Sequence, residues 1–505
     1  MAAIEIRMPW WTREFAWRYN DRRMNALSTH SGTAHAADGC REPLRRHLDS
    51  RIQTSTLARS IRCASLLLLV GLWGCGGDET SQTKPAEHDS ADNGAVSEIP
   101  PPTGRWHRWQ SGHGDAELSA EKQAEIRKLQ TIGYASGTVE ATTEEVVTVH
   151  DEAQAFAGMN FYTSGHAPEA VLADMDGHER HRWQCSYNDA WPEAQLDFNT
   201  VTAMNSWRRA HLFPNGDILA IFEGLGIVKL DKNSQRVWSA LNGAHHDLDV
   251  APDGNIFVLT RTAHTVPRIH RSSPILEDFV VVLDSAGREL KRVSILECYE
   301  NAKIPIENVA EISEHVIDGK RVMLPDLFHT NSLEVLDIRA AESRPEFSEG
   351  NVLISLRTLD RLAVVDLERE QIVWSLRGQF KAQHDPQILP SGHLLLFDNL
   401  GTAERSAVLE LDLASGESRW EYRGSDAKPF YSNTCGTAQR LPNGNTLITE
   451  SDGGRALEVT PSAETAWEFY NPHRAGENDR YIATLFELVR LPPDFPVEWA
   501  DKKAK

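Results

Sequence analysis

The sequence predicts an all-β protein whose main body is a six-bladed β-propeller, preceded by a short helical segment and by a disordered N-terminus of the lipoprotein type. Three observations predict this fold. From residue 155 onward, short β-rich runs alternate with Asp-Gly, Asn-Gly and Ser-Gly turns, which are typical of antiparallel hairpins. Tryptophans recur in this region at intervals of 46 and 47 residues, close to the length of one blade. Finally, two distant strands carry a histidine at the same distance from a turn proline.

The chain begins with two segments that the propeller does not explain. Residues 1–58 are rich in Arg and His and lack apolar periodicity, so we interpret them as translation from a start codon upstream of the true one. Residues 59–75 form a basic and then apolar run that ends in Gly-Cys and is shorter than a membrane-spanning helix of about 20 residues. This run resembles the lipobox signal peptides of bacterial lipoproteins, with Cys75 as the lipidated residue. We therefore expect an exported, periplasmic protein anchored to the membrane by its lipid.

An ordinary signal peptide or an uncleaved anchor is the alternative, and each of these interpretations exports the chain. Residues 76–115 have almost no apolar side chains to bury and are predicted to be a flexible tether. Residues 116–154 are a helical lead-in, since apolar residues occur at helical spacing between Ala116 and Tyr134. The propeller is expected over residues 155–495, with a C-terminal tail at 496–505.

The recurring tryptophans stand at the ends of strands that follow a charged or glycine turn. The gap from Trp238 to Trp374 is close to three repeat units, and the blades within it lack the tryptophan but keep the strand-turn-strand pattern, as in residues 279–290. We expect each indole to pack one blade against the next rather than to bind a cofactor. The five residues are Trp183, Trp238, Trp374, Trp420 and Trp467.

Two segments carry a histidine at matching positions. His246 and His384 each stand directly before an aspartate and six residues before the proline of a turn, whereas a third copy has Gly436 at this position. Because the first strand of each blade lines the central channel, equal register brings the two imidazoles to one channel mouth. A third histidine, His329, also begins a strand of the ring, and Arg357 follows the next strand.

Three imidazoles and one guanidinium suit the transfer of an anionic group. The planar fork of arginine holds two oxygens of a sulfate or phosphate, and a neutral histidine is a competent nucleophile near pH 7 because its ordinary pKa is about 6.5. This chemistry needs no bound metal and no cofactor.

Several segments taken together resemble the bacterial arylsulfotransferase family, the aryl-sulfate sulfotransferases. The similarity covers roughly residues 158–493 and is strongest over 326–470. The segments are Gln383-His384-Asp385, His329-Thr330-Asn331-Ser332, Arg357 within its Ser-Leu-Arg strand, Phe397-Asp398-Asn399, and residues 441–448.

The resemblance implies a six-bladed propeller that moves a sulfuryl group from a phenolic sulfate ester to a phenol, without the nucleotide donor (PAPS) of cytosolic sulfotransferases. It also implies ping-pong kinetics through a sulfohistidine, with His384 as the nucleophile. His246 and His329 would be the acid/base and sulfate-binding histidines, and Asn331 and Arg357 would hold the sulfuryl oxygens.

The family site also contains a threonine, for which the sequence offers Thr434 or Thr437, and register favours Thr437. Register likewise favours His246 over His245, since adjacent strand residues face opposite sides. Larger family members carry an N-terminal β-sandwich. The segment before the first blade is too short and too helical for that domain, so the chain resembles a short form.

The composition excludes several other functions. The net charge of −21 and the pI near 5.4 argue against nucleic acid as a partner. Structural zinc is not expected, because no Cys/His motif with zinc spacing occurs. One disulfide is possible among Cys185, Cys298 and Cys435. The alternatives are a non-catalytic extracytoplasmic binding propeller, a hydrolase of another sulfate or phosphate ester, and a zinc hydrolase, which the positive charge of Arg357 disfavours.

Overall fold

The computed structural model describes residues 139–194, 201–264, 266–269, 275–304, 311–317, 320–337, 340, 344–402 and 405–500. The chain divides into two compact units, residues 1–98 and 99–505, and every described residue belongs to the second. The predicted segments 1–58, 59–75 and 76–115, Cys75 and the predicted helix at 116–134 lie outside the described residues. Within the described part, no helix is long and apolar enough to span a bilayer.

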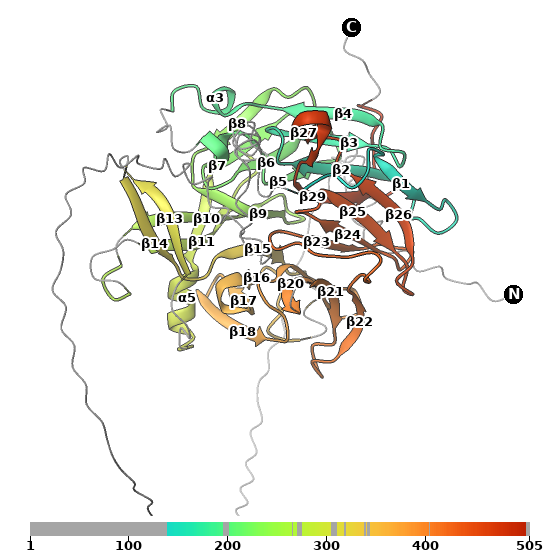
Figure 1. Cartoon of the computed structure of the whole chain (residues 1–505). Helices are drawn as coiled ribbons and strands as arrows, with labels where there is room; N and C mark the ends of the chain where they lie inside the picture. The colour runs from blue at the N-terminus through green and yellow to red at the C-terminus, as the bar shows by residue number, and fades with distance from the viewer. Residues whose placement is uncertain are drawn as a thin grey trace, which may run out of the picture. The chain divides into compact units, whose positions relative to one another are not determined.

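Six antiparallel sheets form the six blades of a β-propeller, as predicted (Figure 1). From the centre outward, blade 1 contains β29 (Leu485–Leu491), β2 (Met159–Ser164), β3 (Glu169–Ala173) and β4 (Glu179–Gln184). Blade 2 contains β5 (Arg209–Leu212), β6 (Ile218–Phe222), β7 (Gly226–Leu230) and β8 (Arg236–Ala240). Blade 3 contains β9 (Ala244–Val250), β10 (Ile256–His264), β11 (Ile275–Leu283) and β12 (Glu289–Ser294), with the extra hairpin β13 (Glu311–Ile317) and β14 (Lys320–Asp326).

The other three blades follow the same order. Blade 4 contains β15 (Thr330–Val335), β16 (Val352–Leu356), β17 (Arg361–Asp366) and β18 (Gln371–Arg377). Blade 5 contains β19 (His384–Ile388), β20 (Leu394–Thr402), β21 (Arg405–Leu411) and β22 (Ser418–Tyr422). Blade 6 contains β23 (Thr437–Arg440), β24 (Thr446–Glu450), β25 (Arg455–Val459) and β26 (Thr465–Tyr470), with β1 (Val147–His150) added outside β26.

Short elements lie between the regular strands. Between blades these are α3 (Tyr187–Ala190), α4 (Val201–Met204), α5 (Ile295–Asn301), the 3-10 turn η3 (Glu477–Asp479), and the small hairpin of β27 (Arg474–Ala475) with β28 (Tyr481–Ile482). The 3-10 turn η2 (Arg357–Leu359) joins β16 to β17 within blade 4.

Apolar side chains fill the spaces between blades. Strands such as β6 and β16 are buried along their whole length because each blade packs between two neighbours, whereas the outer strand β12 is mostly exposed. Among the described residues, six apolar clusters form, and each joins two adjacent blades. The core is thus a ring of six interfaces, which holds the first strands in fixed register around the axis.

The predicted packing role of the tryptophans is confirmed. Each lies in the outermost of the four regular strands of its blade. The indole N–H donates to a carbonyl in a turn of the following blade at 2.9 Å for Trp183 (to Gly216), 3.1 Å for Trp238 (to Ser285), 2.9 Å for Trp420 (to Pro461) and 2.8 Å for Trp467 (to Met175). Trp374 packs edge-on against Phe347 of its own blade, with ring centroids 5.1 Å apart, and lies against the apolar cluster that joins blades 4 and 5.

The interpretation of the long tryptophan gap was wrong. Blade 3 is the only complete blade between β8, which holds Trp238, and blade 4, which holds Trp374. The extra length belongs to α5 and to the hairpin of β13 and β14, so insertion into one blade explains the spacing. The number of blades is nevertheless six.

Both ends of the described chain take part in closing the ring. The last strand, β29, pairs with β2 and is the innermost strand of blade 1, while β1 pairs with β26 of blade 6. The end of the predicted lead-in is therefore a strand. In the predicted tail, Trp499 packs on Trp183, with ring centroids 5.5 Å apart.

The possible disulfide among the three later cysteines does not form. Cys185, Cys298 and Cys435 are buried free thiols, one in each of three separate parts of the propeller. Burial raises the pKa of Cys185 to about 11 and of Cys298 to about 12, so these thiols are inert packing groups.

Candidate active site

The predicted match between the two histidine segments holds in three dimensions. The Asp247 carboxylate accepts the Leu333 N–H of the next blade at 2.9 Å, and the Asp385 carboxylate accepts the Ala438 N–H of the next blade at the same distance. The preceding residues, His246 in β9 and His384 in β19, therefore occupy equivalent places in two blades.

The hydrogen bonds of His384 define which ring nitrogen carries its proton. Its Nδ1 lies 2.7 Å from Asn399 Oδ1 and 3.1 Å from the Ala382 carbonyl. The Asn399 amide group donates to the carbonyls of Ser432 and Cys435, both at 2.8 Å, which orients its oxygen toward His384. Both partners of Nδ1 are thus acceptors, so Nδ1 carries the hydrogen and Nε2 carries the lone pair.

The surroundings of His384 keep the ring neutral. Burial and the positive charge of Arg357 hold its pKa well below the usual range, with Arg208 and His329 acting in the same direction. The hydrogen bond to Asn399 opposes this shift. At neutral pH, His384 is therefore an unprotonated base with its Nε2 available.

His329 and His246 form a second group of imidazoles. His329 Nδ1 lies 2.9 Å from Asp326 Oδ2, a pairing that orients the ring. The rings of His329 and His246 meet edge-on with centroids 5.0 Å apart. Two histidines suited to proton transfer are thus brought together from blades 3 and 4.

The structure distinguishes His246 from its neighbour. His246 contacts the His329 ring, whereas His245 Nε2 lies 3.5 Å from Asp278, within its own blade. The two adjacent histidines share a hydrogen bond between their Nδ1 atoms at 2.8 Å. His246 is therefore the member of the pair that contacts His329.

Both His246 and His329 adopt a left-handed backbone conformation, with φ of +54° and +46°. Such conformations cost about 1 to 3 kcal/mol for residues other than glycine and persist where the surroundings fix them. Here buried carboxylates do so, because Glu223 accepts the His246 N–H at 2.8 Å and Asp326 accepts the His329 N–H at 2.9 Å.

Of the remaining predicted site residues, Arg357 and Asn331 contact the segments that carry the histidines, whereas the two threonines bond within blade 6. Arg357 follows β16, and its N–H donates to the His329 carbonyl at 3.4 Å. The Asn331 amide donates to the Gln383 carbonyl at 2.8 Å, so it binds the backbone beside His384. Thr437 donates its hydroxyl to Thr449 at 2.9 Å, and Thr434 donates its own to Asp452 at 2.8 Å. The structure thus gives both threonines partners within blade 6.

Sequence reasoning missed Arg208, a buried residue whose charge lowers the pKa of His384. Its guanidinium lies over the Phe486 ring, 5.4 Å from the centroid. A signal for it was present, since Arg208 stands six residues before Pro214 and so has the same register as His246 and His384. The roles of Asn399, Glu223 and Asp326 were also missed.

Directly after Arg208, the buried Arg209 spans the channel. Its guanidinium pairs with Asp247 at 2.8 Å, with Asp385 at 3.5 Å and with Glu487. These partners belong to blades 3, 5 and 1, and blade 5 stands opposite the blade of Arg209 in the ring. Burial raises the pKa of Asp247 to about 7, although Arg209 opposes this.

One group of residues in this region has the composition of a metal site. Among the described residues, Glu223, His245 and His246 have ligand atoms within 4.8 Å of one another. The Nδ1 atoms of the two histidines share a hydrogen bond, and His246 Nδ1 lies 3.4 Å from the Glu223 carboxylate. In the structure these contacts orient the histidine pair.

The sequence model of one known family matches this chain. It is described as Arylsulfotransferase (ASST), and it matches residues 209–472, more than half of the chain. The chain belongs to the arylsulfotransferase family. The matched range contains His246, His329, Arg357 and His384, so the family assignment covers the histidine cluster. An arylsulfotransferase-type function and phenolic substrates follow from the family.

No curated protein matches the sequence. Solved structures resemble the arylsulfotransferase chain only distantly. A Bacteroides caccae protein of unknown function is 11% identical and covers 66% of this chain and 98% of its own, with a TM-score of 0.42. Virginiamycin B lyase from Staphylococcus aureus is 9% identical over 67% of this chain and 89% of its own, with a TM-score of 0.36. AztD from Citrobacter koseri is 11% identical over 68% of this chain and 100% of its own, with a TM-score of 0.34. These likenesses carry no argument about activity.

Proposed function

We propose that this arylsulfotransferase moves a sulfuryl group from a phenolic sulfate ester to a phenol, without PAPS, by a ping-pong mechanism through a sulfohistidine at His384. The observation that carries the proposal is the surroundings of His384. Two acceptors face its Nδ1, which leaves the lone pair on Nε2, and burial together with the positive charge of Arg357 holds its pKa well below the usual range.

In the first half-reaction, the Nε2 lone pair of His384 attacks the sulfur of the donor ester. An S–N bond forms as the bond between sulfur and the phenolic oxygen breaks. Arg357 and Arg208 stabilise the negative charge of the sulfuryl oxygens, an effect of about 3 to 4 kcal/mol for one well-placed donor. His329, paired with Asp326, or His246 beside it, donates a proton to the departing phenolate.

In the second half-reaction, an acceptor phenol takes the place of the first. The same histidine pair, now neutral, removes the proton of the acceptor hydroxyl as its oxygen attacks sulfur. The S–N bond breaks and returns the electron pair to His384 Nε2. Asn331 takes part only through the Gln383 carbonyl, by fixing the segment that carries His384.

We further propose that the chain is exported and lipidated at Cys75, which would place the propeller in the periplasm. The support is the basic and apolar run of residues 59–75 and its Gly-Cys end. In cells grown with labelled palmitate, we expect the label on the protein and its loss in Cys75→Ser.

The test of the mechanism uses p-nitrophenyl sulfate as donor. With donor alone, the wild-type protein is expected to release about one equivalent of nitrophenol in a rapid burst, since the sulfohistidine accumulates without an acceptor. Addition of phenol should restore continuous release. His384→Ala should abolish both the burst and the turnover.

His393→Ala is the matched control, because His393 lies in the same blade and pairs with Glu410 at a surface site. It should retain the burst. Continuous release without phenol would indicate a hydrolase, and no release by the folded wild-type protein with several aryl sulfates would favour a binding module. Unchanged turnover in His384→Ala would show that His384 is not the nucleophile.

A further inference from the structure

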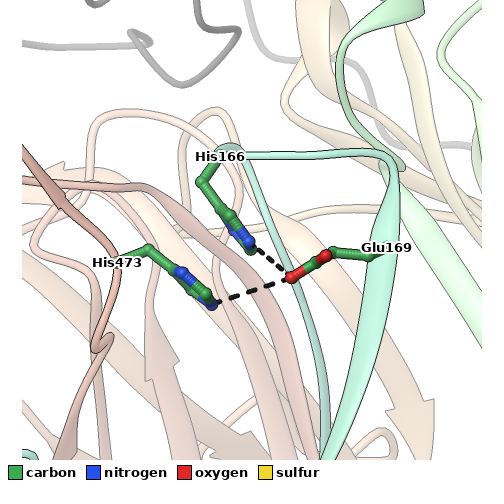
Figure 2. Close-up of side chains that lie close together, drawn as sticks. All are labelled: His166, Glu169 and His473. Carbon is green, nitrogen blue, oxygen red and sulfur yellow. Dashed lines mark hydrogen bonds and ion pairs between the residues drawn. The ribbon is translucent and has the colours of Figure 1, made fainter. Parts of the chain in front are cut away.

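A second cluster of histidines lies outside the sulfuryl site, where blade 6 connects to blade 1. His166 belongs to the loop between β2 and β3 of blade 1, Glu169 is the first residue of β3, and His473 follows β26 of blade 6. Figure 2 shows both imidazoles directed toward the Glu169 carboxylate. His166 Nε2 lies 2.6 Å and His473 Nε2 lies 3.9 Å from Glu169 Oε1.

The geometry of the two rings is unusual for a purely structural contact. They stack face to face with centroids 3.2 Å apart and an interplanar angle of 11°. Aromatic pairs ordinarily keep their centroids about 4.5 to 7 Å apart and avoid direct stacking. The buried His473 Nε2 also has no hydrogen-bond partner among the residues that the structure describes. Two Nε2 atoms beside one carboxylate, one of them without a hydrogen bond, fit a shared ligand. Its binding would require the rings to rotate out of this stack, because the lone pairs of parallel rings do not converge.

We propose that His166 Nε2, His473 Nε2 and the Glu169 carboxylate bind one divalent transition-metal ion, with Zn²⁺ as the best fit. The ligand atoms of these residues lie within 4.8 Å of one another. Two histidines and one carboxylate are a frequent three-ligand set for zinc, with a further position open to water.

The neighbours of the cluster favour this coordination. His166 Nδ1 lies 2.9 Å from Ser164 Oγ, which accepts the Asn471 side-chain N–H at 2.8 Å, so Nε2 is the nitrogen that faces the ligand set.

Arg182 restricts how Glu169 could bind an ion. Its guanidinium pairs with Glu169 Oε1 and with Glu179, so the ion would bind through Glu169 Oε2.

The ion would connect the first and last blades. Since its ligands come from residues 166–169 and 473, it would link segments about 300 residues apart in sequence, beside the strands that close the ring. Metal binding is therefore expected to stabilise the folded ring.

The experiment is titration of the chelator-treated protein with Zn²⁺ by calorimetry, together with the visible absorption of the Co²⁺ form. We expect one equivalent of tightly bound metal, a rise in Tm with Zn²⁺, and a loss of affinity of about 100-fold or more in His473→Ala. Glu169→Gln preserves the side-chain shape and provides a second variant if His473→Ala does not fold.

Two matched controls locate the ion. His178→Ala alters the exposed group of Asp174, Asp176 and His178 on the same blade, and His245→Ala alters the group near His246. Both should retain the zinc and the Co²⁺ spectrum. The proposal fails if the wild-type protein binds no metal at micromolar concentrations. It also fails if His473→Ala and Glu169→Gln bind as well as wild type, or if a control alone loses the ion.

Discussion

The position of one proton determines what His384 can do. With Nδ1–H donated to Asn399 and to the Ala382 carbonyl, the lone pair is on Nε2, where a sulfur atom can receive it. The Asn399 amide is fixed in turn by two backbone carbonyls, so the tautomer of His384 depends on the backbone of blades 5 and 6. Asn399 is therefore a positioning residue for the nucleophile.

Asn399→Ala is expected to lower kcat/KM about 10- to 100-fold, by analogy with losses at groups that orient a reacting histidine. Because the Asn399 hydrogen bond raises the pKa of His384, its removal should lower that pKa further. The acid limb of the pH profile of kcat/KM, already below 6.5 in the wild type, should then move to lower pH.

Asn443→Ala is the control, because Asn443 lies in the exposed turn between β23 and β24. It should change neither the rate nor the profile. A merely structural role of Asn399 would lower the amount of active protein and leave the acid limb in place.

Site residues that recur at the same position of each blade could be predicted from the sequence. Site residues that act by hydrogen-bonding to a histidine from another segment could not. Counting six residues back from a turn proline identified His246 and His384, and the same count applied to Pro214 gives Arg208. Asn399 reaches His384 from the neighbouring strand β20, and Glu223 reaches His246 from the turn after β6 of the preceding blade. Their roles depend on contacts across 15 and 23 residues of sequence, which no local pattern encodes.

At the scale of the element, the fourth strand of a blade attaches that blade to the next one by a tryptophan hydrogen bond. A tryptophan in this strand buries a large ring and satisfies one carbonyl of the next blade, which explains why the residue recurs with the repeat. The recurrence therefore predicted the blades, but it gave a wrong number of blades between Trp238 and Trp374. The fourth strand of blade 3 has no tryptophan, and α5 and the extra hairpin lengthen the chain there.

Trp467→Phe should destabilise the fold by about 1 to 3 kcal/mol, because it removes the bond to Met175 and leaves space in a fully buried site. Trp420→Phe should cost less, since its indole is partly exposed. Urea unfolding of both variants tests the order. Equal midpoints would contradict the assigned packing role.

At the scale of the whole molecule, the two ends of the described chain contribute unequally to closure. Strand β1 adds only an outer edge to blade 6, whereas β29 is the innermost strand of blade 1 and carries Arg490, which pairs with Glu458 at 2.9 Å in a fully buried site. Three leucines of β29 are also buried, namely Leu485, Leu488 and Leu491.

Removal of residues 485–505 should abolish cooperative unfolding. The three leucines alone contribute about 1.5 to 3 kcal/mol each, a sum comparable with the net stability of about 5 to 15 kcal/mol that is usual for a domain. A chain that begins at Asp151 and so lacks β1 should still unfold cooperatively, at a lower urea concentration than the full chain. Circular dichroism during urea titration distinguishes the two cases, and a cooperative transition without β29 would show that the ring closes by other contacts.

The ion-pair group around Arg209 has a kinetic consequence. Since its guanidinium reaches carboxylates of blades 1, 3 and 5 from blade 2, side chains occupy the axis directly behind the histidines. Under the proposed mechanism, we expect the donor and the acceptor both to reach His384 from the side away from these ion pairs. The spent phenol would then leave along the path by which the acceptor enters, so the two aromatic molecules would occupy the site in turn.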